Sequence, residues 1–212
     1  MVQMKVNFDK LVSIIVNRGK KHRSITAIAG PPCSGKSTLA MDLCARINSY
    51  ELNSADIFQM DGFHYDDIVL NDLGLLSKKG SPNTFDIPGF TFMLKRLFEN
   101  REKSIAVPVF DRELEVSRNG SNIIEASVRH LIVEGNYLML KEKPWSDLLK
   151  FYDTTIFINV SPNVFKKRLE HRWKSLTEEV RRKRILDNDL PNANYIFGNS
   201  LDTEFLYENR KN

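Results

Sequence analysis

The stretch Gly30-Pro31-Pro32-Cys33-Ser34-Gly35-Lys36-Ser37 fits the pattern G-x-x-x-x-G-K-[ST] without a mismatch. It follows an apolar run at 25–29 and precedes a helix-forming run at 38–47, so it stands between a predicted strand and a predicted helix. A phosphate-binding loop requires that context. The glycines let consecutive backbone N–H groups point inward, and the helix N-terminus adds partial positive charge where the phosphates lie.

The pattern also predicts the roles of individual residues in this loop. Lys36 is expected to reach the β- and γ-phosphates of ATP and to act in catalysis, because a cation there stabilises the charge of the transition state. Ser37 is expected to hold Mg²⁺. The residues expected to bind ATP in this segment are Gly30, Ser34, Gly35, Lys36, Ser37 and Thr38.

Length, composition and charge favour one intracellular enzyme domain. The 212 residues contain no Pro-, Gly- or Ser-rich divider, which predicts a single domain over 1–212 with a lid region at about 162–190. The net charge is +4, and much of the basic excess lies at 166–184, which we attribute to phosphate binding rather than to nucleic acid. No apolar run approaches about 18 residues, so no membrane partner is expected and the predicted location is cytoplasmic. Cys33 and Cys44 lack metal-ligand spacing, which suits a reducing compartment.

Strand and helix signals alternate along the rest of the chain. Strands are predicted at 24–29, 55–60, 106–110, 129–133 and 154–160. Helices are predicted at 7–17, 38–47, 88–99, 162–172 and 177–187. Pro108 is expected to move its strand towards a sheet edge, and Ser161 with Pro162 is expected to open a helix. The alternation predicts an α/β fold: a three-layer P-loop NTPase fold with a mostly parallel sheet and a helical lid.

Two carboxylates follow predicted strands at the edge where a parallel sheet binds its ligands. Asp61 comes after 55–60, and Glu134 comes after 129–133. Phosphoryl transfer needs metal ions on the phosphates and a carboxylate that orients or deprotonates the attacking hydroxyl. Asp61 could also be a turn former, since it precedes Gly62. A carboxylate directly after a buried strand, as at Glu134, needs a cationic partner.

Several motifs together resemble those of the phosphoribulokinase/uridine kinase superfamily, and they occur in that superfamily's order over most of 24–196. They are the phosphate loop and the stretches at 60–64, 79–86, 107–112, 132–135 and 188–192. The similarity is greatest to pantothenate-kinase-like and fructose-transport-type kinases. It implies that Asp61 is the catalytic base and that Glu134 is the Walker-B-type carboxylate near Mg²⁺. It also implies that Arg168 and Arg172, which share a helix face, close over the phosphates, with Arg172 assisting catalysis.

The resemblance also points to an acceptor pocket. The segment 80–86 is similar to the one that shapes this pocket in the family, and Phe110 stands where uridine kinases usually have Tyr. The residues expected to contact the acceptor are Asp61, His64, Tyr65, Lys79 and Arg112. The run 188–192 resembles one that lies near the adenine in pantothenate kinases, which implies that Asn192 binds ATP. The alternative for this run is a turn that ends a helix before Pro191.

We therefore predict an ATP- and Mg²⁺-dependent kinase that transfers the γ-phosphoryl group to a hydroxyl of a small metabolite, of sugar or pantothenate type. The alternatives are a uridine or cytidine kinase and a nucleotide-gated ATPase or regulator without an acceptor. No Asn-Lys-x-Asp run for guanine recognition is present. The expected partner is a small-molecule substrate, with no nucleic acid, and self-association into a homodimer is left open.

Overall fold

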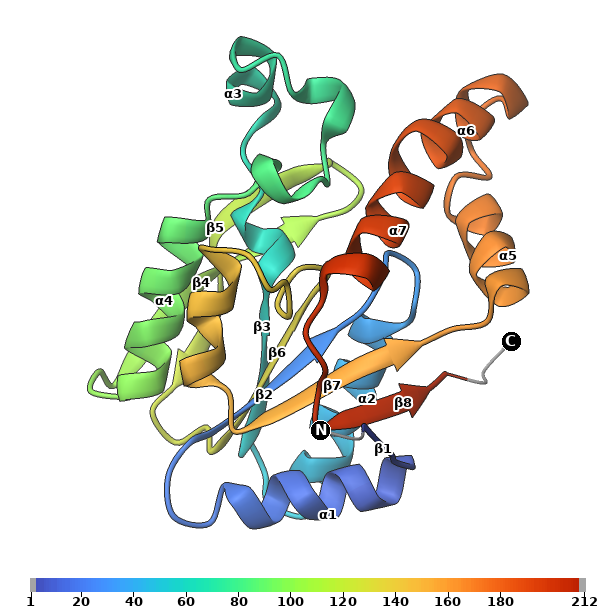
Figure 1. The fold of residues 1–212 in the computed structure, drawn as a ribbon. Helices are drawn as coiled ribbons and strands as arrows, with labels where there is room; N and C mark the ends of the chain where they lie inside the picture. Colours follow the sequence, from blue (N-terminus) through green and yellow to red (C-terminus); the bar gives the residue numbers. More distant parts are fainter. Residues whose placement is uncertain (1–2, 210–212) are drawn as a thin grey trace.

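The computed structural model describes residues 3–209 and is built around a six-stranded parallel sheet (Figure 1). The strand order is β1-β8-β7-β2-β6-β3. These strands are β1 (Met4–Lys5), β2 (Ser24–Ala29), β3 (Ala55–Gln59), β6 (His130–Gly135), β7 (Thr154–Asn159) and β8 (Phe205–Glu208). Every neighbouring pair in the sheet is parallel, which confirms the predicted α/β fold.

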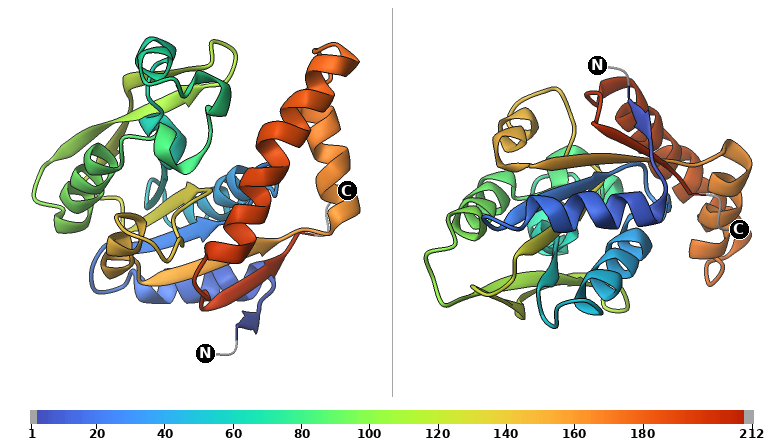
Figure 2. Two further views of the ribbon diagram at one scale, coloured as in Figure 1. Left: turned by 45° about the horizontal axis from the view of Figure 1, so that its top comes forward. Right: turned by 90° about the horizontal axis from the view of Figure 1, so that it is seen from below.

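Helices occupy most of the connections between these strands. The α-helices are α1 (Phe8–Arg18), α2 (Lys36–Asn48), α3 (Asp67–Asp72), α4 (Ile87–Glu99), α5 (Pro162–Arg172), α6 (Glu178–Arg184) and α7 (Leu190–Asn199). The 3₁₀ turns are η1 (Met60–Phe63), η2 (Leu76–Lys78), η3 (Pro82–Thr84) and η4 (Trp145–Phe151), and η5 (Ile185–Asp189) is π-helical. Each predicted helix is present, with ends that differ by at most a few residues. The helices α5 to α7 form the lid, which projects beyond the sheet (Figure 2).

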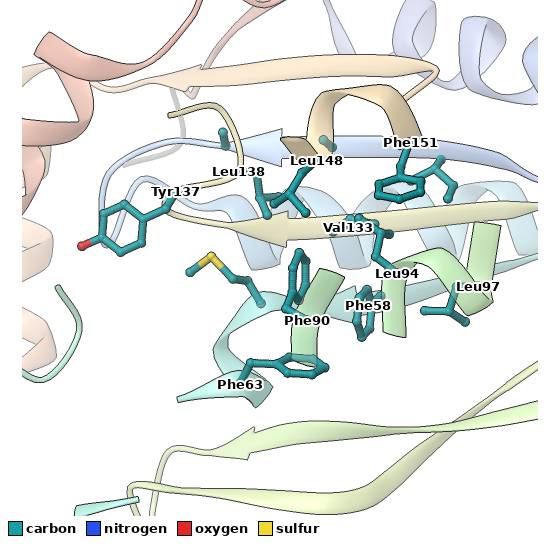
Figure 3. Packing of buried hydrophobic residues seen from close by; sticks show 14 of the residues in the cluster. Phe58, Phe63, Phe90, Leu94, Leu97, Val133, Tyr137, Leu138, Leu148 and Phe151 are labelled. Carbon is teal, nitrogen blue, oxygen red and sulfur yellow. The ribbon is translucent and has the colours of Figure 1, made fainter. Parts of the chain in front are cut away.

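Side chains alternate across the buried strands and build two apolar layers. In β6, Leu131 and Val133 face one layer while Ile132 faces the other. The first layer contains α4, η4 and a cluster of aromatic rings, in which Phe58 and Phe90 are stacked at 5.0 Å (Figure 3). The second layer contains α1 and α2. The sheet is thus covered on both faces, as the three-layer prediction requires, and its carboxyl edge is left for the site.

The strand predicted at 106–110 differs from the prediction in both length and partner. It is β4 (Ser104–Asp111), and it pairs antiparallel with β5 (Val116–Glu125) in a separate two-stranded sheet, not at an edge of the parallel sheet. The pairing register shifts between Val107 and Val109, so Pro108 lies at a bulge, where its missing N–H costs no ladder bond. The strand β5 went unpredicted because its residues are mostly polar and exposed, and Asn119-Gly120 reads as a turn.

The run at 188–192 differs from the turn that the sequence left open as an alternative. The run 188–192 does not form a helix-ending turn, because η5 continues into α7 and Pro191 occupies the first turn of that helix. The helical segment thus continues to Asn199, and the lid region predicted at about 162–190 covers α5, α6 and η5. Ser161 precedes α5 with extended backbone, but its side chain makes no capping hydrogen bond, and Pro162 opens the helix as expected.

Within residues 3–209, every helix is too short or too polar to cross a lipid bilayer.

Candidate active site

The phosphate loop joins β2 to α2 and holds its own lysine. Gly35 precedes α2 with φ +97°, a backbone conformation that favours glycine. Lys36 is buried, and its Nζ donates to the carbonyl oxygen of Pro31 at 2.9 Å across the loop. Burial lowers the pKa of Lys36, while the nearby carboxylates Glu134 and Asp61 oppose that shift. The loop therefore places a desolvated ammonium group at the floor of the site.

Beside the loop lies a hydroxyl–carboxylate pair. Ser37 Oγ donates to Glu134 Oε1 at 3.1 Å. Glu134 is 3% exposed, and its place near the end of β6, between Ile28 of β2 and Gln59 of β3, fixes it at the carboxyl edge of the sheet. Burial raises the pKa of Glu134, Asp61 adds to this shift, and Lys36 and the Ser37 hydrogen bond reduce it. Hydroxyl and carboxylate oxygens are ligands that suit Mg²⁺.

No group of three or more His, Cys, Asp or Glu residues within 3–209 is arranged to hold a metal ion. A magnesium ion at Ser37 and Glu134 would therefore take its remaining ligands from phosphate oxygens and water. Mg²⁺ in phosphate-transfer sites is commonly bound in this way, through one or two carboxylates plus the substrate. The residues present thus fit a magnesium ion that arrives with a nucleotide.

Asp61 lies opposite this pair, in the turn η1 directly after β3. Its Oδ2 accepts a hydrogen bond from Arg112 Nη2 at 2.8 Å, and its side chain is 17% exposed. Burial opposes ionisation of Asp61, yet His64, Arg112 and Lys36 together hold the pKa of its carboxyl below the ordinary value. Asp61 therefore lies at the cavity surface in surroundings that favour its carboxylate form.

His64 and Phe110 form the wall beside Asp61. His64 Nδ1 donates to the carbonyl oxygen of Asp61 at 2.8 Å, and its ring lies 4.1 Å from that of Phe85 and 4.7 Å from that of Phe110. Burial lowers the pKa of His64, against the raising effect of Asp61. A neutral, aromatic-packed imidazole with its Nδ1 committed leaves Nε2 as the ring atom able to face a ligand.

The cations on this side of the cavity have protein partners. Lys79 Nζ donates to Asp67 Oδ1 and to the carbonyl oxygen of Glu115, both at 2.6 Å, and lies 5.6 Å from the centre of the Phe110 ring. Arg112 is paired with Asp61, as described above. These two side chains therefore connect α3, η1 and the β4–β5 hairpin around the cavity.

The lid arginines contact the outer side of the phosphate loop. Arg168 Nη1 donates to the carbonyl oxygens of Cys33 at 3.2 Å and Ser34 at 3.0 Å. Arg172 Nη1 lies 3.8 Å from Cys33 Sγ. Their i, i+4 spacing thus brings both guanidinium groups to the loop, and closure over the phosphates stays a prediction.

A second group in the lid surrounds Trp173. The guanidinium groups of Arg172 and Arg184 lie 4.9 and 4.1 Å from the centre of its ring, and its indole N–H donates to Asp189 Oδ2 at 2.8 Å. Trp173 also lines the cavity. The rings of Tyr137 and Trp145, by contrast, are buried in the core.

The lid also reaches the segment that shapes the acceptor side. Asn188 Nδ2 donates to the carbonyl oxygen of Lys79 at 2.9 Å, and Asn192 Nδ2 donates to Asn188 Oδ1 at 3.0 Å. Tyr137, which follows β6, donates from its Oη to the carbonyl oxygen of Gly80 at 2.6 Å. Asn188 and Asn192 thus contact each other, both line the cavity, and the π-helical turn brings Asn188 to Lys79.

These groups surround one cavity of about 530 Å³ at the carboxyl edge of the sheet. Most of the predicted site residues line it; the three that do not are Gly30, Ser34 and Tyr65. Six cationic and four carboxylate side chains are among its described lining residues, so it carries an excess of positive charge that suits phosphates. A second cavity of about 650 Å³ shares Cys33, Arg168 and Arg172 with the first.

Sequence reasoning missed several lining residues. Glu115, Asn136, Trp173, Arg184 and Asn209 belong to no motif that we used. The charged run at 166–184 was a signal for Arg184, although it did not single out that residue. Nothing near Asn209 pointed to the site, because its contact with the loop depends on the pairing of the last strand.

Comparison with known proteins gives three informative similarities, while no family model matches the chain. A provisionally named uridine kinase of Schizosaccharomyces pombe is 30% identical over 95% of this chain and 90% of its own length. A pantothenate kinase of Lactococcus lactis subsp. lactis is 32% identical over 72% of this chain and 50% of its own length. The crystal structure of a provisionally named fructose transport system kinase from Silicibacter sp. TM1040 is 32% identical. It covers 95% of this chain and 98% of its own, with a TM-score of 0.84.

Proposed function

The chain belongs to the P-loop kinases of the phosphoribulokinase/uridine kinase superfamily, which are small-molecule phosphotransferases, and we propose that it uses ATP and Mg²⁺ to phosphorylate a hydroxyl group of a sugar or pantothenate-like metabolite. The observation that carries the proposal is the convergence of Lys36, Asp61 and Glu134 on one cavity at the carboxyl edge of the sheet. We further propose that the described residues act as one kinase domain with a lid over α5 to α7.

The donor side would bind the phosphates of ATP. Backbone N–H groups of the loop point at the phosphates, and Lys36 exchanges its contact with Pro31 for the β- and γ-phosphates. Ser37 and Glu134 would hold Mg²⁺, which neutralises phosphate charge when bound. Arg172 adds positive charge from the lid, and the second cavity leaves room for the nucleoside end of ATP beside Cys33.

The acceptor side would deprotonate the attacking hydroxyl. Arg112 engages Asp61 Oδ2, which leaves Oδ1 to accept the proton of the acceptor. The acceptor oxygen forms a bond to the γ-phosphorus while the bond from that phosphorus to the β–γ bridging oxygen breaks, and ADP leaves. The cations beside Asp61 lower its pKa and favour the carboxylate form that can accept a proton, while catalysis rests on positioning and charge stabilisation.

The surroundings of Asp61 favour a polyhydroxylated acceptor. His64 and Asn136 bring hydrogen-bonding groups to the cavity, whereas Lys79 and Arg112 already have carboxylate partners. An anionic acceptor would have to compete with Asp67 and Asp61 for these cations. We therefore place sugars first and pantothenate-like acids second among the candidates.

Uridine or cytidine is the alternative acceptor, favoured by the name of the yeast relative. Against it, Phe110 lines the cavity without the hydroxyl group that a tyrosine would bring for hydrogen bonding to a base. The Phe110 ring instead lies beside His64, Lys79 and Arg112.

An acceptor panel tests the proposal. ADP release would be measured with MgATP against fructose and other hexoses, pentoses, pantothenate, uridine and cytidine, each compared with the acceptor-free rate. We expect a sugar to give the highest kcat/KM. A preference for uridine or cytidine by more than about tenfold, roughly 1.4 kcal/mol, would contradict the acceptor class. No stimulation by any compound would favour the acceptor-free ATPase.

A further inference from the structure

The outer side of the phosphate loop is hydrogen-bonded by two side chains that come from remote parts of the chain. A loop that turns its N–H groups inward to phosphates turns carbonyl groups outward, and these need donors. The carbonyl oxygen of Ser34 accepts from Asn209 Nδ2 at 2.8 Å and from Arg168 Nη1 at 3.0 Å. Asn209 and Arg168 thus both donate to an outward-facing carbonyl group of the loop.

The sheet itself delivers Asn209 to this position. Strand β8 runs parallel to β7 with Asn159 opposite Glu208, and the next residue, Asn209, donates its backbone N–H to the carbonyl oxygen of Asn159 at 3.1 Å. Arg168, by contrast, belongs to α5 of the lid. The loop therefore has one donor fixed to the sheet and one that belongs to the lid.

The contact between Asn209 and the loop is close. A Cβ atom at Gly35 would lie 2.1 Å from Asn209 Nδ2, so the amide group packs directly on the loop backbone. Gly35 also has φ +97°, which any other residue would adopt with strain. Asn209 lines the cavity that would receive the phosphates.

We infer that Asn209 is a positioning residue for the donor nucleotide. It holds the Ser34 carbonyl group outward, and this keeps the N–H groups of residues 34–36 directed at the phosphates. Because Asn209 is fixed to the sheet, it does so whether or not the lid contacts the loop. The inference rests on the proposed use of ATP. It gives the last strand, remote in sequence from the loop, a part in nucleotide binding.

Binding of MgADP by calorimetry tests this without knowledge of the acceptor. Asn209→Asp replaces the amide donor with a carboxylate that repels the Ser34 carbonyl, and Asn209→Ala removes the donor alone. The matched control is Asn159→Asp, which makes the same charge change at an exposed side chain on the neighbouring strand. Asn209→Gln, which keeps an amide donor, is the conservative variant.

We expect Asn209→Asp to weaken MgADP binding about tenfold or more and Asn209→Ala about three- to tenfold, as for loss of a partly buried hydrogen bond. The control should stay within about twofold of the wild type, and Asn209→Gln should lie between the wild type and Asn209→Ala. Melting temperatures should match, because a positioning role changes affinity rather than folding.

Two results would overturn the inference. One is affinity of Asn209→Asp within about twofold of the Asn159→Asp control. The other is loss of the fold in both Asn209→Asp and Asn209→Ala, which would make Asn209 a structural residue of β8. Failure of the wild type to bind MgADP would instead refute the proposed function.

Discussion

The donor and acceptor halves of the site are built in different ways. The donor half, residues 30–38 with Glu134, is one continuous loop and helix start beside a neighbouring strand. The acceptor half, around Asp61, combines η1, the segment at 79–80, the β4–β5 hairpin and the tip of the lid. The backbone of the donor half is therefore local, with Glu134, Arg168 and Asn209 added from other elements, whereas the whole acceptor half depends on long-range packing.

The cations of the two halves differ in the same way. Lys36 binds a neutral carbonyl group and is buried between two carboxylates, so it is ready to exchange partners for phosphate. Lys79 and Arg112 already form ion pairs with Asp67 and Asp61. Substitutions in the donor half should consequently cost more activity than those at the ion pairs of the acceptor half.

The largest effect is expected at Lys36. Lys36→Ala removes the cation that would lie between the β- and γ-phosphates, so ADP formation with the best acceptor should fall by on the order of 10³ or more. The control is Lys10→Ala, at an exposed site on α1. Activity of Lys36→Ala within about tenfold of the wild type would refute the assignment of the donor half.

Asp61 is the residue where the halves meet, and its substitution should have the next largest effect. Asp61→Asn keeps the shape but cannot accept a proton, so kcat should fall about 10²-fold or more while the affinity for ATP changes only a few-fold. Asp72→Asn, an exposed site on α3, controls for the charge change. A large loss of affinity for ATP with an unchanged kcat at saturating substrate would show that Asp61 binds metal. Its role would then be exchanged with that of Glu134.

The contrast between the halves also explains what could be predicted from the sequence. The loop, β2 and the carboxylates Asp61 and Glu134 could be located because a motif or a strand end marks each of them. The strand β5 could not, since its polar residues show no alternation and its partner β4 supplies the pairing. Asn188 and Asn209 act through backbone carbonyl groups far away in sequence, and no local pattern encodes such contacts.

A smaller effect is expected at Glu134. Glu134→Gln keeps the volume of the side chain and an oxygen for Ser37, but loses the charge that would hold Mg²⁺. The Mg²⁺ concentration for half-maximal activity should rise about tenfold, with a smaller change in kcat at saturating Mg²⁺. Glu142→Gln, at an exposed site remote from the loop, serves as the control. An unchanged Mg²⁺ titration would place Glu134 outside the metal shell.

The smallest effect, and the sharpest test of the acceptor half, concerns the ion pair between Lys79 and Asp67. Its Nζ to Oδ1 distance is 2.6 Å, and the Asp67 side chain is 55% exposed, so the pair is worth about 1 kcal/mol or less. One possibility is that Lys79 only stabilises the position of residues 79–80. Lys79→Gln and Asp67→Asn should then each raise the KM of the acceptor by about two- to fivefold and leave the KM of ATP unchanged.

The two variants should diverge if Lys79 instead binds an anionic group of the acceptor. Lys79→Gln would then raise the acceptor KM more than about tenfold, because a charge-assisted contact is lost. Asp67→Asn would leave the acceptor KM unchanged or lower it, since Lys79 would be released from its partner. Comparison of these two variants thus distinguishes a polyhydroxylated acceptor from an anionic one. The positive charge of the cavity does not make this distinction, because it suits the phosphates of ATP as well as an anionic acceptor.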